Sequence, residues 1–275
     1  MKQVNSFRKF FALLEVDFYK LFRSLSFYII FGAYALLTVL NVLLSYAANI
    51  MIETSYGDAM LLGIDLTSSN LLFGTNINYS NFGLFLVIFF AIFLCTEFKD
   101  NTIRNKLTQG YSRTVVYVAS LTFTYIVSLM AVVLSSALIA AVGIPVLGWE
   151  GSDYALQYFF YELFALLPLI AFIHTLAYGS KSLGITLGVG LPLITILPGI
   201  VSILNVFAID NKAVEWFTRI FFISLEAYMP MALAPIQFGE SAFSNLALNA
   251  SLTYILWTAL FIALGYLTFT KKDVK

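Results

Sequence analysis

The stretch that decides the fold is EFKDNTIRNKLTQGYSR, which covers residues 97–113. It is a charged segment between two hydrophobic runs, 82–95 and 115–142, and it carries four of the chain's fifteen Lys and Arg residues. This pattern predicts a short connection between two membrane-spanning helices at one membrane surface. The same composition also fits a plain cytoplasmic loop that follows the positive-inside rule.

Within this stretch the local pattern predicts helix, stop, helix. The first helix has three candidate capping residues, Asp100, Asn101 and Thr102. It ends near Gln109, and Ile103 and Leu107 lie one turn apart on the same face. Gly110 suits the left-handed position just past a helix end, and Ser112 can cap the helix that follows.

Composition places the chain in a membrane. It has 275 residues, of which 60% are hydrophobic and 11% are charged, whereas soluble domains are about a quarter charged. The formal net charge is zero, so the sequence gives no reason to expect binding to nucleic acid. Cys95 is the only cysteine, which rules out an internal disulfide and a cysteine-based metal site.

A family resemblance rests on this same stretch. Glu97 at the end of a span, NTIRNKL at 101–107 and GYSRT at 110–114 resemble the loop between spans two and three of type-2 ABC exporter permeases, most closely those of the bacitracin and lantibiotic-immunity sort. The strong part covers about 25 residues, and the span count and loop lengths agree over the whole chain. Many relatives carry a Lys where this chain has Ala119 and Ser120.

The resemblance implies that residues 99–110 form a coupling helix that docks on a separate ATP-hydrolysing subunit. Ile103 and Leu107 would form an apolar plug in that docking contact. The full set of expected docking residues is Glu97, Asp100, Ile103, Arg104, Lys106, Leu107 and Arg113.

An amphipathic helix is predicted over residues 6–23. Its apolar arc consists of Phe7, Phe10, Phe11, Leu14, Phe18, Leu21 and Phe22. The charged residues fall on the other side, and they are Arg8, Lys9, Asp17, Lys20 and Arg23, with Glu15 at the edge. A helix of this kind lies in the headgroup layer, and the resemblance implies that it is the elbow helix before the first span.

The fold class expected is an all-α polytopic membrane protein in a single transmembrane domain, 1–275, with six spans. The spans are 27–46, 82–95, 115–142, 154–178, 183–207 and 248–268. With the N-terminus inside, thirteen of the fifteen Lys and Arg residues lie on the inner side. This bias predicts that both termini are cytoplasmic.

Residues 212–245 are expected to form an extracellular re-entrant segment between spans five and six. The run 214–229 is largely apolar but places Glu215, Arg219 and Glu226 on one stripe, which makes crossing the bilayer costly. The resembled family has re-entrant helices at this place. The alternative is a seventh span, which would put the C-terminal lysines outside.

Catalysis is not expected in this chain. It has no Gly-x-x-x-x-Gly-Lys-Ser/Thr phosphate loop, so no cofactor is expected here, and ATP and Mg would belong to the partner ATPase. His174 is the only histidine and lacks the partners of a zinc site or a general base. Glu162 precedes it by twelve residues, roughly 18 Å along one helix.

Two readings of Glu162 stay open: an acid near a span can contact cargo or a neighbouring helix, or it can lie in water at the outer interface. By resemblance, the expected function is the permease subunit of an exporter for an antimicrobial or amphipathic peptide, in a bacterial plasma membrane. Its partners would be an ATP-binding subunit, a second copy or a similar permease, the lipid bilayer, and peptide or lipid-like cargo. The alternative is a non-ABC carrier, or an immunity protein that acts without ATP.

Overall fold

The computed structural model describes residues 6–56, 82–148, 155–196, 200 and 245–271. Within these residues every regular element is a helix. This agrees with the all-α class that the composition predicts.

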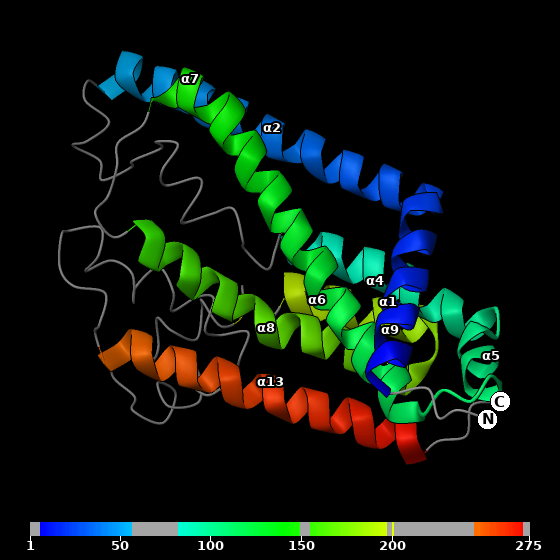
Figure 1. The fold of residues 1–275 in the computed structure, drawn as a ribbon. Coiled ribbons are helices and arrows are strands. Elements are labelled where there is room, and N and C mark those ends of the chain that lie inside the picture. The colour runs from blue at the N-terminus through cyan, green and yellow to red at the C-terminus, as the bar shows by residue number, and fades with distance from the viewer. Residues whose placement is uncertain (1–5, 57–81, 149–154, 197–199, 201–244, 272–275) are drawn as a thin grey trace.

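Four long helices set the length of the molecule: α2 (Leu25–Tyr56), α6 (Arg113–Leu138), α8 (Ala155–Ser180) and α13 (Asn245–Lys271). In Figure 1, α8 and α13 lie side by side, and α6 crosses from the lower right to the upper left toward the far end of α2. The amphipathic helix α1 (Ser6–Arg23) runs crosswise at the right-hand end of the bundle (Figure 1).

The remaining elements are shorter. Helix α4 (Leu84–Lys99) packs against α8 and against α9 (Leu183–Thr195). The short helix α5 (Thr102–Thr108) follows α4 at the end where α1 crosses the bundle (Figure 1). Beyond α6 the helix continues through a π-helical turn, η4 (Ile139–Gly143), into α7 (Ile144–Leu147).

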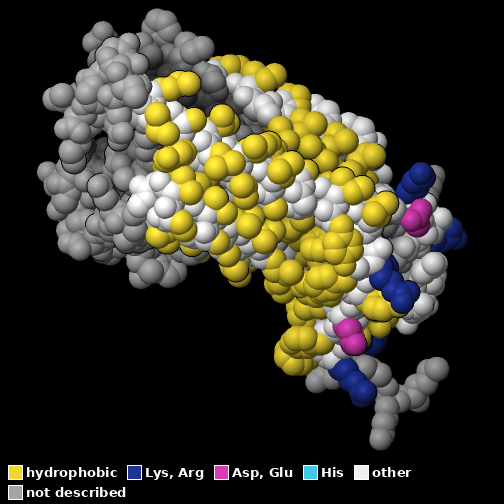
Figure 2. Space-filling view, turned by 90° about the horizontal axis from the view of Figure 1, so that it is seen from above, with side chains coloured by type: hydrophobic (Ala, Val, Ile, Leu, Met, Phe, Trp, Pro, Cys, Tyr) yellow, Lys and Arg dark blue, Asp and Glu magenta, His cyan; other side chains and the backbone are white. Residues whose placement is uncertain are grey.

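Three described helices are long and apolar enough to cross a membrane: Leu25–Ala48, Arg113–Leu147 and Leu252–Lys271. They correspond to the predicted spans one, three and six. Figure 2 shows hydrophobic side chains over the body of this face, with Lys, Arg, Asp and Glu gathered at one end. These helices indicate a helical membrane protein, and the charged side chains that the structure describes collect at the end formed by α1 and α5.

The other predicted spans have a mixed outcome. The run 82–95 overlaps α4, which begins at Leu84 and continues to Lys99, and the run 154–178 overlaps α8. Of the span predicted at 183–207, the structure describes α9 and residues 196 and 200. The predicted re-entrant segment at 212–245, with Glu215, Arg219 and Glu226, lies outside the described residues apart from residue 245. A count of six spans stays a prediction.

Aromatic side chains fill the centre of the described bundle. Phe123 of α6 stacks on Phe93 of α4, with ring centroids 4.9 Å apart, and Phe18 of α1 meets Phe123 edge-on at 5.2 Å. Gly265 of α13 leaves room for the side chains of Tyr117 from α6 and Thr175 from α8, because an added Cβ would clash with both hydroxyl groups. The contact between Phe18 and Phe123 packs α1 against α6 at the end of the bundle where the described charges lie.

Candidate functional site at the charged end of the bundle

The path of the chain between α4 and α6 is set by its turn residues. Asn101 takes a left-handed conformation (φ 56°) and begins α5, but its side chain makes no capping hydrogen bond. The predicted start of the helix is therefore confirmed, but the predicted side-chain cap is wrong, because the residue at the cap position, Asn101, makes no such hydrogen bond. Gly110 is left-handed (φ 86°), and Ser112 Oγ accepts a hydrogen bond from the Val115 amide at 3.3 Å, as predicted.

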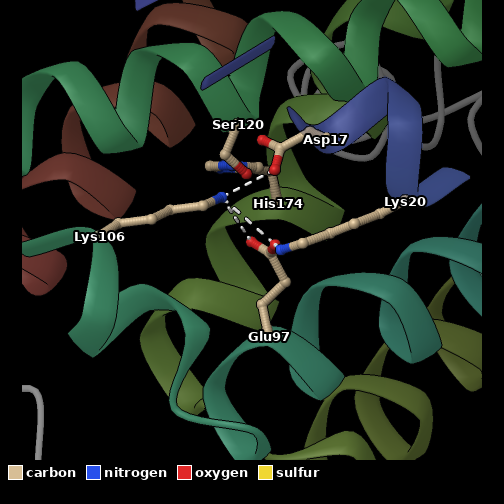
Figure 3. A network of polar contacts seen from close by, with 6 residues as sticks. All are labelled: Asp17, Lys20, Glu97, Lys106, Ser120 and His174. Carbon is tan, nitrogen blue, oxygen red and sulfur yellow. Dashed lines mark hydrogen bonds and ion pairs between the residues drawn. The ribbon is translucent and has the colours of Figure 1, made fainter. Parts of the chain in front are cut away.

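A buried network of charges joins α1, α4 and α5 (Figure 3). The ammonium group of Lys106 donates to Asp17 Oδ1 at 2.8 Å and to both carboxylate oxygens of Glu97 at 3.3 Å. Lys20 donates to Glu97 Oε1 at 2.8 Å. We call these four residues the clasp, because they tie α1 to α4 and α5, which lie more than 60 residues further along the sequence.

Most of the clasp is removed from solvent. Asp17 is 1% exposed, Glu97 5% and Lys106 6%, whereas the side chain of Lys20 is 35% exposed. Burial of a charge is costly unless a partner of opposite charge is in contact with it. Two lysines face two carboxylates here, so the clasp as a whole is neutral.

The surroundings shift the pKa of two members. Burial, together with the nearby charge of Glu97, raises the pKa of Asp17 to about 6, against the opposing effect of Lys106. Burial alone would lower the pKa of Lys106, but the carboxylates of Glu97 and Asp17 outweigh burial and raise it. Lys106 is therefore charged at neutral pH, while Asp17 changes its charge in mildly acidic conditions.

The raised pKa of Asp17 predicts how stability depends on pH. The pKa of Asp17 is higher in the folded state than its ordinary value of 3.8, so protonation of Asp17 favours folding. This stabilisation is fully present below pH 3.8 and is lost as the pH rises through about 6. We expect the free energy of unfolding of the wild type, relative to Asp17→Asn, to increase as pH falls from 7 to 4. Thermal unfolding of both proteins across this range measures the difference, and a constant difference would contradict the assignment.

Outside the clasp, two basic residues hold the ends of helices. Lys9 donates to the carbonyl oxygen of Gly110 at 2.9 Å, and so ties α1 to the turn after α5. Arg113 donates to the carbonyl oxygen of Thr270 at 2.7 Å and to that of Phe269 at 3.3 Å. A cation at the carboxyl end of a helix is favourable, and Arg113 thereby joins the start of α6 to the end of α13.

The structure divides the residues expected to dock a partner into two groups. Asp100 and Arg104 are exposed, as is the neighbouring Lys99. Ile103 is 1% exposed, and Leu107 is half-buried against the core of the chain. In this conformation the expected apolar plug therefore lies inside the chain and not on its surface.

The other expected docking residues also have partners within the chain. Glu97 and Lys106 belong to the clasp, and Arg113 is half-buried at the end of α13. The reason is that α5 has only seven residues and lies against α4 and α6, so its apolar side turns toward those helices. Glu162 lies on α8, but its side chain lies outside the described residues.

Sequence reasoning missed Asp17 as a member of the site and placed it on the charged face of α1. In the structure Asp17 shares the buried side of α1 with Leu13 and Leu21, one turn to either side. The exposed side of α1 instead presents Phe7, at 69% exposure, and Phe11, at 52%. An acid between leucines at i−4 and i+4 is the signal that could have identified the buried position.

A second polar group lies near the clasp (Figure 3). His174 Nε2 is 3.2 Å from Ser120 Oγ, and its ring stacks on Tyr178 with centroids 4.3 Å apart. Among the described residues, no group of three or more His, Cys, Asp or Glu side chains is placed to hold a metal ion. The described site therefore consists of ion pairs and hydrogen bonds.

Comparison with protein-family models gave no match, and comparison with curated proteins gave none either.

Proposed function

We propose that this chain is the permease subunit of an ABC exporter of the type-2 kind, and that a separate subunit hydrolyses the ATP. The observation that carries the proposal is the short helix α5, which lies between the apolar helices α4 and α6 and is tied to α4 and α1 by the clasp. Because α5 is fixed to α4 and α1, a partner that displaces α5 would displace these helices with it.

The outer face of this end offers a contact surface for a soluble partner. Lys99, Asp100 and Arg104 are exposed around α5, while Ile103 and Lys106 on the opposite side anchor it. The proposed docking surface consists of Lys99, Asp100 and Arg104. This surface is polar, so electrostatic complementarity would set the orientation of the partner.

The remaining parts of the proposal follow from the sequence. The bias of Lys and Arg toward this end supports a cytoplasmic position for it, with both termini inside a bacterial plasma membrane. The resemblance of residues 97–113 to the immunity permeases supports an antimicrobial or amphipathic peptide as cargo. It also supports a second permease as partner, so that two subunits enclose a pathway.

Co-purification tests the proposal. The tagged full-length chain is purified from the membranes of its native host, and bound proteins are identified by mass spectrometry. We expect a soluble protein with a phosphate-binding loop, and vanadate-sensitive ATP hydrolysis in the complex. Transport that persists without any nucleotide-hydrolysing partner would contradict the proposal.

Charge reversal then tests the docking surface. Lys99→Glu with Arg104→Glu is expected to reduce capture of the ATPase at least about tenfold, because each lost charge contact costs on the order of 1 kcal/mol. The matched control is Arg8→Glu with Lys271→Glu, two exposed positions on α1 and α13. Equal loss of capture in both variants would show a general charge effect and no specific role for α5.

A further inference from the structure

One polar side chain in the described membrane spans is exposed where lipid would be expected. Asn41 lies in the apolar segment Leu25–Ala48 of α2, and its side chain is exposed. Its backbone carbonyl accepts a hydrogen bond from Ser45 Oγ at 2.9 Å, but its side-chain amide has no hydrogen-bond partner among the described residues. Within the described part of the chain, the donor and the acceptor of this side-chain amide are therefore unsatisfied.

The depth of Asn41 makes this costly. Counted along the helix, it lies roughly 7 Å from the middle of the Leu25–Ala48 segment, within a hydrocarbon layer about 30 Å thick. An amide without a hydrogen bond in an apolar medium costs about 2–7 kcal/mol. A lipid tail can neither donate nor accept a hydrogen bond, so lipid does not remove this cost.

The other two candidate spans show no such exposed amide. Along α6 the strongly exposed side chains include Leu129 and Val133, and along α13 they include Leu256 and Leu260, all of which are apolar. Those faces suit lipid. Of these three candidate spans, α2 is the one with an exposed side-chain amide on a surface that would otherwise contact lipid.

The neighbours of Asn41 have the spacing of a helix–helix contact. Leu37, Asn41, Leu44, Ala48 and Met51 follow one another at intervals of four and three residues. Leu37 is 47% exposed, Leu44 65% and Met51 69%. Such spacing forms the seam of a left-handed helix pair, and one Asn within a leucine seam fixes the register of the two helices.

We infer that this seam of α2 contacts α2 of a second copy of the same chain. An amide is complementary to itself, because it carries both a donor and an acceptor. A twofold axis along the membrane normal brings each Asn41 beside its equivalent at the same depth, and both side chains are satisfied. The inference identifies the second permease of the proposed assembly as an identical chain, and in that respect it rests on the proposed function.

Cysteine cross-linking in membranes tests the inference with Asn41 left in place. In a Cys95→Ala background, Leu44→Cys is compared with Leu256→Cys on α13. The two leucines are 65% and 69% exposed, and each lies four residues from the end of its apolar segment. We expect oxidation to link Leu44→Cys into a dimer of twice the chain mass and to leave Leu256→Cys monomeric.

Substitution of Asn41 gives the energetic test. Energy transfer between differently labelled copies in liposomes should show dimerisation weakened about three- to thirtyfold by Asn41→Leu and largely kept by Asn41→Gln, since a hydrogen bond between membrane helices contributes about 0.6–2 kcal/mol. Absence of the Leu44→Cys dimer, equal cross-linking at both positions, or a product with another protein would overturn the inference. Neither assay measures capture of the ATPase, so failure here leaves the docking proposal intact.

Discussion

Lys106→Met should lower the free energy of unfolding by about 3–5 kcal/mol, because it leaves the carboxylates of Asp17 and Glu97 buried with only Lys20 beside them. The melting temperature of the purified protein should fall on the order of 10 °C. Thermal unfolding in detergent, followed by loss of the monodisperse peak in size-exclusion chromatography, measures this. The methionine keeps most of the volume of the lysine stem, so lost packing is a small part of the effect.

Two controls separate charge from volume. Asp17→Asn removes the acid whose pKa burial has already raised and keeps an oxygen that accepts from Lys106, so its effect at pH 7 should be small. The triple variant Asp17→Asn, Glu97→Gln, Lys106→Met has no buried charge among these three positions and should recover most of the stability that Lys106→Met loses. A triple variant as unstable as the single one would show that the clasp does not act through charge pairing.

Ile103→Asp should have the second large effect, a loss of about 5 kcal/mol that prevents isolation of folded protein. The change removes a fully buried side chain from the core and puts a carboxylate with no designed partner in its place. The yield of monodisperse protein after membrane extraction is the measurement. Leu107→Asp should have a smaller effect, because Leu107 is half-buried.

Arg104→Asp is the matched control on the next residue of the same helix. The new side chain is identical, but Arg104 is exposed, so stability should change by no more than about 0.5 kcal/mol. The pair also tests the docking surface, because Arg104→Asp should weaken capture of the ATPase while the chain stays folded. If Ile103→Asp were stable and failed to bind the ATPase, Ile103 would be a docking residue, as the sequence pattern predicts.

Local patterns in the sequence predicted much of the secondary structure. The helix predicted at 6–23 has the bounds of α1, and three apolar runs appear as helices long enough to span a membrane. Gly110 and Ser112 take the backbone and capping roles that their residue types favour. These features depend on residues within a few positions of one another, so the sequence contains the information directly.

The candidate site depended on contacts that local patterns do not contain. Lys106 and Asp17 are 89 positions apart, and no periodicity in either helix predicts that they meet. The spacing of Ile103 and Leu107 predicted that they share a face of α5, but not whether that face meets a partner or the chain itself. In the same way, the sequence showed a polar residue at position 41 but not the side of α2 on which it is exposed.

The sequence by itself determined that this is a helical membrane protein with a charged connection between two apolar helices, because composition and helical periodicity are properties of short segments. Only the tertiary structure decided that this connection is held by a buried clasp to α1 and that its apolar side faces inward. Packing of helices distant in the chain settles which side chains lose contact with solvent, and the pairing of buried charges follows from that packing.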